Sequence, residues 1–245
     1  MTKKDRITDL TDQLNELQLP LMAASLESIF HSKDYNELDT LTILERIVEP
    51  EYQEKQSQKF QNRLKRAHLA GGPQSIDQCK DSSERVYLPA DITSTLSSLD
   101  FIKDGLNVCV LGPSDSGKSY LSKALGIQSC LKYRTSYHHC EELLEAMVAL
   151  KQSDYQKYQK KVRFFIKLDL LILDDFLLHT ITDEREIKVL FELLEKRSEL
   201  CRSTIVCSQR EPSSWASMIL NDEVSANSIL KRATKHYTVV IRPRD

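Results

Sequence analysis

Two kinds of apolar pattern alternate in the second half of the chain. Short apolar runs, typical of buried strands, stand between longer stretches with the spacing of amphipathic helices. The predicted strands cover residues 108–111, 134–137, 170–173, 204–207 and 238–241. The predicted helices lie near residues 118–131, 141–150, 155–168, 184–200 and 213–232. This alternation indicates an α/β fold whose parallel sheet is covered by helices on both faces.

The first 70 residues have a helical pattern. Leucines recur at helical spacing between residues 10 and 17, and a second apolar face covers residues 21–30. Pro20 precedes that face, where it suits the first turn of a helix. A third stripe over residues 41–48 is expected to end at Pro50, because proline disrupts the interior of a helix. We expect the three stripes to pack against one another.

The stretch between these two regions is rich in glycine, serine, aspartate and proline. Its weak periodicity favours a loop with short helical turns. The pattern therefore predicts a helical N-terminal domain over residues 1–70, a connector over residues 71–100 and an α/β domain over residues 101–245.

Composition narrows the class of protein. Of the 245 residues, 29% are charged and 40% are hydrophobic, as in a folded globular chain. No apolar run approaches the roughly 18 residues of a membrane span, so no membrane partner is expected. The six cysteines include no C-x-x-C pair, which favours reduced thiols and a cytoplasmic location. Because the net charge is −2, any affinity for nucleic acid must come from local basic patches.

A glycine-bounded loop stands between the first predicted strand and helix of the α/β region. It fits G-x-x-x-x-G-K-[ST], the phosphate-binding loop of nucleoside triphosphatases. Gly112 and Gly117 allow the backbone to curl so that its N–H groups face phosphate oxygens. Lys118 can reach the β- and γ-phosphates, and the Ser119 hydroxyl can bind Mg²⁺. The predicted nucleotide-binding residues are Gly112, Pro113, Ser114, Asp115, Ser116, Gly117, Lys118 and Ser119.

Polar residues follow two of the predicted strands. Asp174 and Asp175 come directly after the strand over residues 170–173, where buried carboxylates need a counter-ion. Mg²⁺ bound to a triphosphate supplies one, so Asp174 is predicted to hold the metal through water and Asp175 to orient or deprotonate the attacking water. Ser208 and Gln209 follow the strand over residues 204–207 and are candidate contacts to the γ-phosphate. The alternatives are an acidic turn and an ordinary strand end.

Basic residues suggest two further roles. Arg232 lies at the end of a helical stretch and is a candidate arginine finger that reaches the γ-phosphate of a neighbouring subunit; an ordinary surface arginine is the alternative. Two basic stretches, one near residue 65 and one near residue 160, are candidate contacts to DNA phosphates. A solvated helix face is the alternative for both, and the stretch near residue 65 could also contact a partner. The predicted DNA contacts are Lys157, Lys160, Lys161, Arg163, Arg63, Lys65 and Arg66.

Segments outside the phosphate loop are similar to one protein family. Residues 17–26 are similar to its opening L-x-L-P-x-M-A-x-x-L, and residues 62–69 to its basic R-L-K-R-A-x-L helix end. Residues 203–209, with Trp215, are similar to its S-T-I-V-T-S-Q-x-P-x-x-x-W segment. Over nearly its whole length the chain therefore resembles the IstB-like transposition helper proteins of insertion sequences, which are AAA+ ATPases of the helicase-loader type.

The resemblance implies both a fold and a function. The fold would be an AAA+ sheet of order 5-1-4-3-2, preceded by a small all-α domain. The protein would hydrolyse ATP with Mg²⁺, assemble into a ring or helical homo-oligomer on duplex DNA, and recruit and stimulate a transposase. By position in the family's motifs, Lys118 and Ser119 would bind phosphate and Mg²⁺, Asp174 and Asp175 would serve metal binding and hydrolysis, Ser208 or Gln209 would be the sensor, and Arg232 would be the finger.

The chain departs from the family pattern at a few positions. Residues 114–116 replace the middle of the usual G-P-P-G-T-G-K-[ST] loop, and a carboxylate there, that of Asp115, repels phosphate unless it points to solvent. Leu177 replaces a usual glycine, and Lys231 replaces the usual acid before the finger. Weak hydrolysis is therefore expected. The alternative functions are a DnaC-like loader of a replicative helicase and a non-hydrolysing, nucleotide-dependent DNA-binding module.

Overall fold

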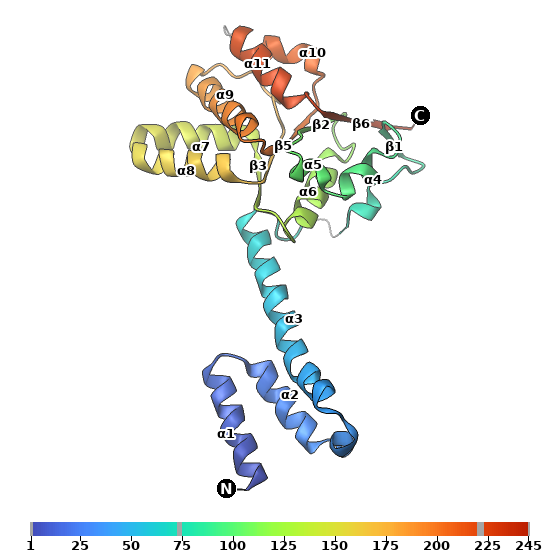
Figure 1. Ribbon diagram of the computed structural model, residues 1–245. Coiled ribbons are helices and arrows are strands. Elements are labelled where there is room, and N and C mark those ends of the chain that lie inside the picture. Colours follow the sequence, from blue (N-terminus) through green and yellow to red (C-terminus); the bar gives the residue numbers. More distant parts are fainter. Residues whose placement is uncertain (1, 73–74, 220–222, 245) are drawn as a thin grey trace. The chain divides into compact units, whose positions relative to one another are not determined.

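The structure is a computed structural model that describes residues 2–72, 75–219 and 223–244. The chain divides into two compact units, Met1–Asn62 and Arg63–Asp245 (Figure 1). The domain limits predicted at residues 70 and 100 stay a prediction. No helix within the described ranges combines the length and the apolar character that a membrane span requires.

Helices make up the first unit. Its elements are α1 (Lys3–Glu16), α2 (Pro20–His31), the 3₁₀ helix η1 (Lys33–Glu37) and α3 (Thr40–Arg66), whose last four residues belong to the second unit. A capping box begins α1: the Thr2 hydroxyl accepts from the N–H of Asp5 at 3.2 Å, and the Asp5 carboxylate accepts from the N–H of Thr2 at 2.7 Å. The core of the unit is formed by Leu26, Ile29 and Ile47.

The predicted end of the third helix at Pro50 is wrong, because α3 continues through this residue to Arg66. The next residue explains why the helix continues. Glu51 is buried, and its carboxylate accepts hydrogen bonds from the N–H groups of Leu21 at 2.9 Å and Met22 at 3.4 Å. It therefore supplies the cap that Leu19 lacks at the start of α2, where the helix dipole favours negative charge. This contact requires α3 to remain helical beyond the proline.

The predicted apolar stripes are buried less than expected. Ile47 is buried, whereas Leu41, Leu44 and Val48 on the same predicted stripe are exposed. Leu17, which follows the last residue of α1, is likewise exposed, at 69%. Helical spacing identifies a shared face, but it does not specify whether another element covers that face.

A mostly parallel sheet forms the centre of the second unit. Its strands are β1 (Arg85–Leu88), β2 (Val108–Leu111), β3 (Thr135–His139), β4 (Leu170–Asp174), β5 (Ser203–Ser208) and β6 (Tyr237–Pro243). The sheet has six strands in the order β1-β6-β2-β5-β4-β3, and β1 pairs antiparallel with β6 while the other pairs are parallel. Numbered from β2, the five parallel strands have the order 5-1-4-3-2, which confirms the predicted AAA+ arrangement.

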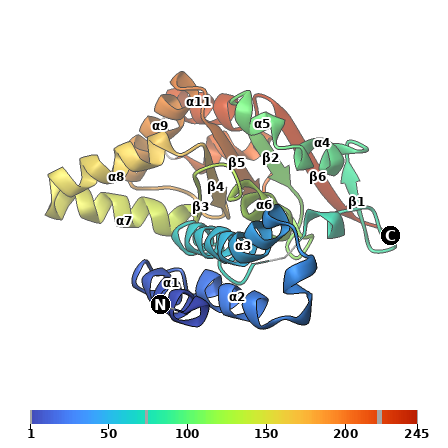
Figure 2. The same cartoon turned by 60° about the horizontal axis from the view of Figure 1, so that its bottom comes forward.

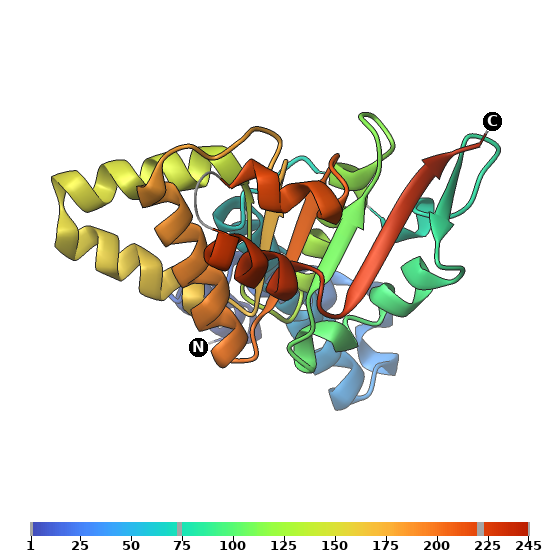
Figure 3. The same ribbon diagram turned by 90° about the horizontal axis from the view of Figure 1, so that it is seen from above.

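Helices cover both faces of this sheet, as the sequence predicts. They are α4 (Ile92–Ser97), α5 (Asp100–Lys103), α6 (Lys118–Ser129), α7 (Cys140–Ser153), α8 (Tyr155–Lys167), α9 (Glu184–Glu199), α10 (Pro212–Trp215) and α11 (Glu223–Ala233), with the 3₁₀ helices η2 (Ile76–Gln78) and η3 (Ala216–Met218). The sheet lies between α6 on one face and α9 and α11 on the other (Figure 2). The antiparallel pair α7 and α8 extends from the β3 edge (Figure 3). The strands β2, β4 and β5 are buried along their whole length, which explains the apolar runs at their centres.

Strand β1 lies in the stretch that was predicted to be a loop with short helical turns, and that prediction is wrong at these four residues. Its pairing runs from Arg85 opposite Pro243 to Leu88 opposite Val240. Tyr87 is its one fully buried residue, so the strand carries almost no apolar periodicity that a sequence pattern could reveal.

A buried arginine fixes the end of α8. The Arg197 guanidinium donates to the carbonyl oxygens of Phe165 at 2.5 Å and Leu168 at 3.0 Å, and to the Thr204 hydroxyl at 3.0 Å. It also bonds to the carbonyl of Ser203. Burial lowers the pKa of Arg197 to about 9. The arginine thus joins α9 to β5 and to the last turn of α8.

Candidate functional site

The loop from β2 to α6 has space for only a hydrogen atom on the Cα of Gly112, and its backbone conformation at Gly117 favours glycine. A Cβ atom on Gly112 would lie 2.5 Å from the carbonyl oxygen of Ile241 and 2.7 Å from the Ser116 hydroxyl. Gly117 has a φ of 100°, and a Cβ there would lie 2.6 Å from the Arg85 guanidinium. That guanidinium also donates to the Ser116 carbonyl at 3.2 Å. Strand β1 therefore supports the loop from outside, a role that the sequence pattern did not reveal.

The N-terminus of α6 faces the inside of this loop. Lys118 is its first residue, and the buried ammonium donates to the carbonyl of Pro113 at 2.7 Å. Burial lowers the pKa of Lys118, while nearby Cys207, Asp174 and Asp175 act in the opposite direction. Helix geometry leaves the first N–H groups of α6 without partners inside the helix. A positive helix end and a buried ammonium together form a site for an anion.

Both predicted carboxylates lie at the carboxyl end of β4, and the neighbouring strand β3 holds each of them. The Tyr137 hydroxyl donates to Asp174 at 2.5 Å, and burial, together with that carboxylate, raises the pKa of the tyrosine, so it stays a donor. His139 Nδ1 lies 2.9 Å from Asp175 Oδ2. Asp174 is fully buried, and one of its oxygens also accepts from the N–H of Asp175 at 3.0 Å. Sequence reasoning missed Tyr137 and His139, because their role depends on the register of β3 against β4.

A cavity of about 360 Å³ brings the phosphate loop and the strand ends together. Asp175 and Gln209 line it opposite the loop, whereas Ser208 is buried beside it and its hydroxyl accepts from the N–H of Arg210 at 3.1 Å. The volume lies in the range of small-molecule sites. The described lining residues are Ser114, Asp115, Gly117, Lys118, Ser119, Tyr120, Asp175 and Gln209.

The donor set at this cavity fits ATP with Mg²⁺. A serine hydroxyl and carboxylates are the hard oxygen ligands that Mg²⁺ prefers; Ser119 and Asp175 line the cavity, and the buried Asp174 adds a second negative charge next to Asp175 at the end of β4. The lysine and the helix N-terminus supply positive charge on the other side. Asp115 is exposed on the loop with a φ of 60°, at the position where the family pattern has a glycine.

Arg232 does not line this cavity among the described residues. Its guanidinium pairs with Glu195 on α9 and donates to the Ser228 carbonyl at 3.0 Å, and its side chain is 23% exposed. Its carbonyl accepts from the Asn107 amide at 2.8 Å. The structure thus places Arg232 between α11 and α9, and its role as a finger stays a prediction.

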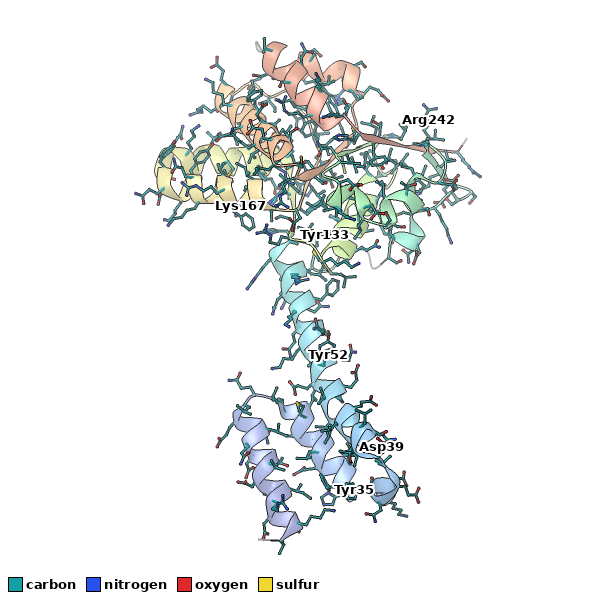
Figure 4. All side chains as sticks on the ribbon, in the orientation of Figure 1. Tyr35, Asp39, Tyr52, Tyr133, Lys167 and Arg242 are labelled. Carbon is teal, nitrogen blue, oxygen red and sulfur yellow. The ribbon has the colours of Figure 1, made fainter. Side chains whose placement is uncertain are left out.

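A second cavity, of about 430 Å³, lies at the amino ends of β3 and β4 and gathers basic residues from three segments: the end of α3, the turn before β3, and α8. Among the predicted DNA contacts, Arg63, Arg66, Lys160 and Arg163 line it. The others, Lys65, Lys157 and Lys161, do not, and Lys157 pairs with Asp154 at 3.2 Å. In Figure 4, Tyr133 and Lys167 mark the region of this cavity. The full described lining is Arg63, Arg66, Cys130, Lys132, Tyr133, Arg134, Thr135, Lys160, Arg163, Phe164, Lys167 and Leu168.

Lys132 and Arg134 were missed in the sequence. They stand singly in the turn between α6 and β3, so no basic run marks them. Their place beside α8 follows from the sheet order, in which β3 and β4 are neighbours.

Comparisons with known proteins agree with this architecture. The family model described as IstB-like ATP binding protein matches residues 12–243. The putative ATP-binding protein of insertion sequence IS232 from Bacillus thuringiensis subsp. berliner is 27% identical over 238 residues, which cover 97% of this chain and 92% of that protein. The putative insertion sequence ATP-binding protein y4pL of Sinorhizobium fredii is 30% identical over 221 residues, covering 90% and 88%.

The fold also occurs among solved structures. The crystal structure of the DnaC helicase loader superposes with a TM-score of 0.52 and 18% identity, covering 68% of this chain and 96% of that chain. This likeness shows a shared AAA+ fold.

Proposed function

This chain belongs to the family of IstB-like ATP-binding proteins of insertion sequences, and from that premise we propose that it is a Mg²⁺-dependent ATPase that assembles on duplex DNA and recruits a transposase. The observation that carries the proposal is the shared cavity. Two sequence segments about 55 residues apart, the phosphate loop and the end of β4, face the same space. A site of this kind orients a triphosphate between positive charge and carboxylates.

On this proposal each side chain has a distinct task in binding and hydrolysis. Lys118 and the free N–H groups of α6 hold the β- and γ-phosphate oxygens. Ser119 would hold Mg²⁺ directly and Asp174 would hold it through water; when bound, Mg²⁺ would neutralise the charge that develops on the phosphates. Asp175 accepts a proton from, or orients, the attacking water, and Gln209 at the cavity wall contacts the γ-phosphate side.

DNA binding is assigned to the basic residues on α8 and at the end of α3. Contacts of lysine and arginine with phosphate bind the DNA backbone without reading the bases. A protein whose net charge is −2 needs such a concentrated patch, and the second cavity provides it.

Size-exclusion chromatography of the full chain with duplex DNA tests the proposal. Addition of Mg²⁺ and a non-hydrolysable ATP analogue should shift protein and DNA together to a large complex. The same elution with and without the analogue would contradict nucleotide-dependent assembly. Capture of the transposase encoded by the same insertion sequence on immobilised protein–DNA complex tests recruitment separately.

An Asp115→Gly variant should bind ATP about tenfold more tightly, because one negative charge near the phosphates disappears. Glycine also adopts the φ of 60° at this position without strain. Asp115→Asn is the matched variant, because asparagine tolerates this backbone conformation and removes only the charge. Titration with a fluorescent ATP analogue measures both, and unchanged affinity in both variants would show that the carboxylate points away from the phosphates.

An Arg163→Gln variant should weaken binding to duplex DNA of any sequence and lower the magnitude of the salt slope, log K against log[salt], by about 1. Lys103→Gln, an exposed change on α5 outside the cavity, should leave the slope unchanged. Fluorescence anisotropy at several salt concentrations gives both slopes. Equal slopes in wild type and Arg163→Gln would remove this arginine from the interface.

A further inference from the structure

The second cavity lies on the opposite rim of the sheet from the phosphate loop. Thr135 and Leu168 line it just where β3 and β4 begin, whereas the ATP cavity lies where β4 ends. Its volume of about 430 Å³ is that of a small-molecule site. A DNA duplex is a rod that can lie across such an opening but cannot enter it.

The cavity carries a large excess of positive charge. Arg66, Lys132, Lys160, Arg163 and Lys167 line it, and none of these side chains forms an ion pair with any described residue. This set of uncompensated cations selects a ligand with more than one negative charge.

Two further arginines at the cavity interact with other groups of the protein. The Arg63 guanidinium donates to the carbonyl oxygens of Cys130 at 3.1 Å and Leu131 at 2.7 Å. Arg134 lies 3.6 Å from the Asp169 carboxylate, which also pairs with Arg202. Asp169 is therefore neutralised by its own partners. These contacts hold the cavity wall in place before any ligand binds.

An aromatic surface accompanies the cations. Phe164 is 46% exposed and lines the cavity together with Tyr133 and Leu168. Its ring packs edge-on against the buried Phe165 at a centroid distance of 5.4 Å, so it is held in position. Contact with the phosphates of an intact duplex gives no reason for an exposed ring of this kind. Aromatic rings beside lysine and arginine are typical of sites where unstacked bases bind.

We propose that this cavity binds one nucleotide that has left the base stack, with its base on Phe164 and its phosphates between Arg66, Lys160 and Arg163. The inference rests on the proposed function, because it specifies the form of DNA that the basic residues take. It follows that the protein prefers DNA in which a base is unpaired or displaced over a regular duplex of the same sequence.

Binding of three fluorescently labelled DNAs to the full chain tests the inference. They are a regular duplex, the same duplex with one unpaired extra nucleotide, and the corresponding single strand. Wild type should bind the bulged duplex about tenfold more tightly than the regular one. Phe164→Ala should remove this preference and leave the affinity for the regular duplex unchanged. Tyr155→Ala, which removes another exposed ring of α8 outside the cavity, should keep the preference.

A competition experiment shows whether the cavity takes a free nucleotide or only a nucleotide within a strand. It uses the Lys118→Ala variant, whose phosphate loop is impaired, with the labelled bulged duplex bound. Displacement of the bulged duplex by millimolar AMP would assign the cavity to free nucleotide as well as to DNA, and displacement only by single strand would assign it to DNA alone.

Equal affinity of wild type for regular and bulged duplex would overturn the inference, as would an equal loss on both DNAs in Phe164→Ala. ATP-dependent assembly on regular duplex in that same variant would leave the proposed function standing. Circular dichroism and a Phe164→Leu variant, which keeps apolar bulk without the flat ring, separate a loss of stacking from a loss of folding.

Discussion

An Asp175→Asn variant should bind ATP as tightly as wild type and hydrolyse it at least about 100-fold more slowly. Asp175 is the carboxylate that lines the cavity opposite Lys118, and it is partly exposed there, so it can reach a water molecule next to the γ-phosphate. Asparagine has nearly the same shape and can still accept a hydrogen bond from His139, but it cannot take a proton. Release of radiolabelled phosphate from ATP measures the rate, and a fluorescent ATP analogue measures affinity.

The control for this variant is Asp104→Asn, an exposed aspartate after α5, which should leave both quantities unchanged. Wild-type hydrolysis in Asp175→Asn would show that another group activates the water. A wild-type protein that binds ATP and releases no phosphate would instead identify a non-hydrolysing, nucleotide-dependent DNA-binding module.

A Lys118→Ala variant should lose ATP affinity by about 100-fold or more and with it the ATP-dependent complex on DNA. The lysine contributes a buried positive charge, and its loss leaves Asp175 at the cavity and the buried Asp174 next to it without that counter-charge. Only the positive N-terminus of α6 would then balance the charge of the phosphates. Titration with labelled ATP and size-exclusion chromatography measure the two effects.

Lys103→Ala, which removes an exposed lysine from α5, is the matched control. Because alanine lacks the hydrogen bond to Pro113, circular dichroism and binding of regular duplex without ATP should confirm that Lys118→Ala is folded. Undiminished ATP affinity in a folded variant would place the triphosphate outside this loop.

Sequence patterns were sufficient for the centre of the fold. β2, β4 and β5 are buried along their whole length and have apolar centres, and the predicted limits of the five parallel strands differ from the observed ones by at most two residues. Strand β1 was missed because only Tyr87 of its four residues is buried. The helix through Pro50 was missed because its continuation depends on Glu51 reaching α2, a contact between residues 30 positions apart.

In the candidate site too, residues that are contiguous in sequence were predicted and residues brought in by strand pairing were missed. The phosphate loop and the Asp174–Asp175 pair are contiguous in sequence, so a motif identifies them. Tyr137, His139 and Arg85 reach the site through strand register, and no spacing in the sequence encodes that register. The basic cavity combines the end of α3, the turn before β3 and α8, and the sequence predicted only two of these three parts.

Strand β3 has a part in both cavities. Thr135, its first residue, lines the basic cavity, and Tyr137 and His139 near its other end hold Asp174 and Asp175 at the end of β4, where Asp175 lines the ATP cavity. An extended strand of five residues is roughly 17 Å long and does not stretch. A displacement of Thr135 along the strand therefore also displaces His139. On the proposed function, coupling between the two cavities would be reciprocal: a factor by which ATP raises the affinity for DNA is also the factor by which DNA raises the affinity for ATP.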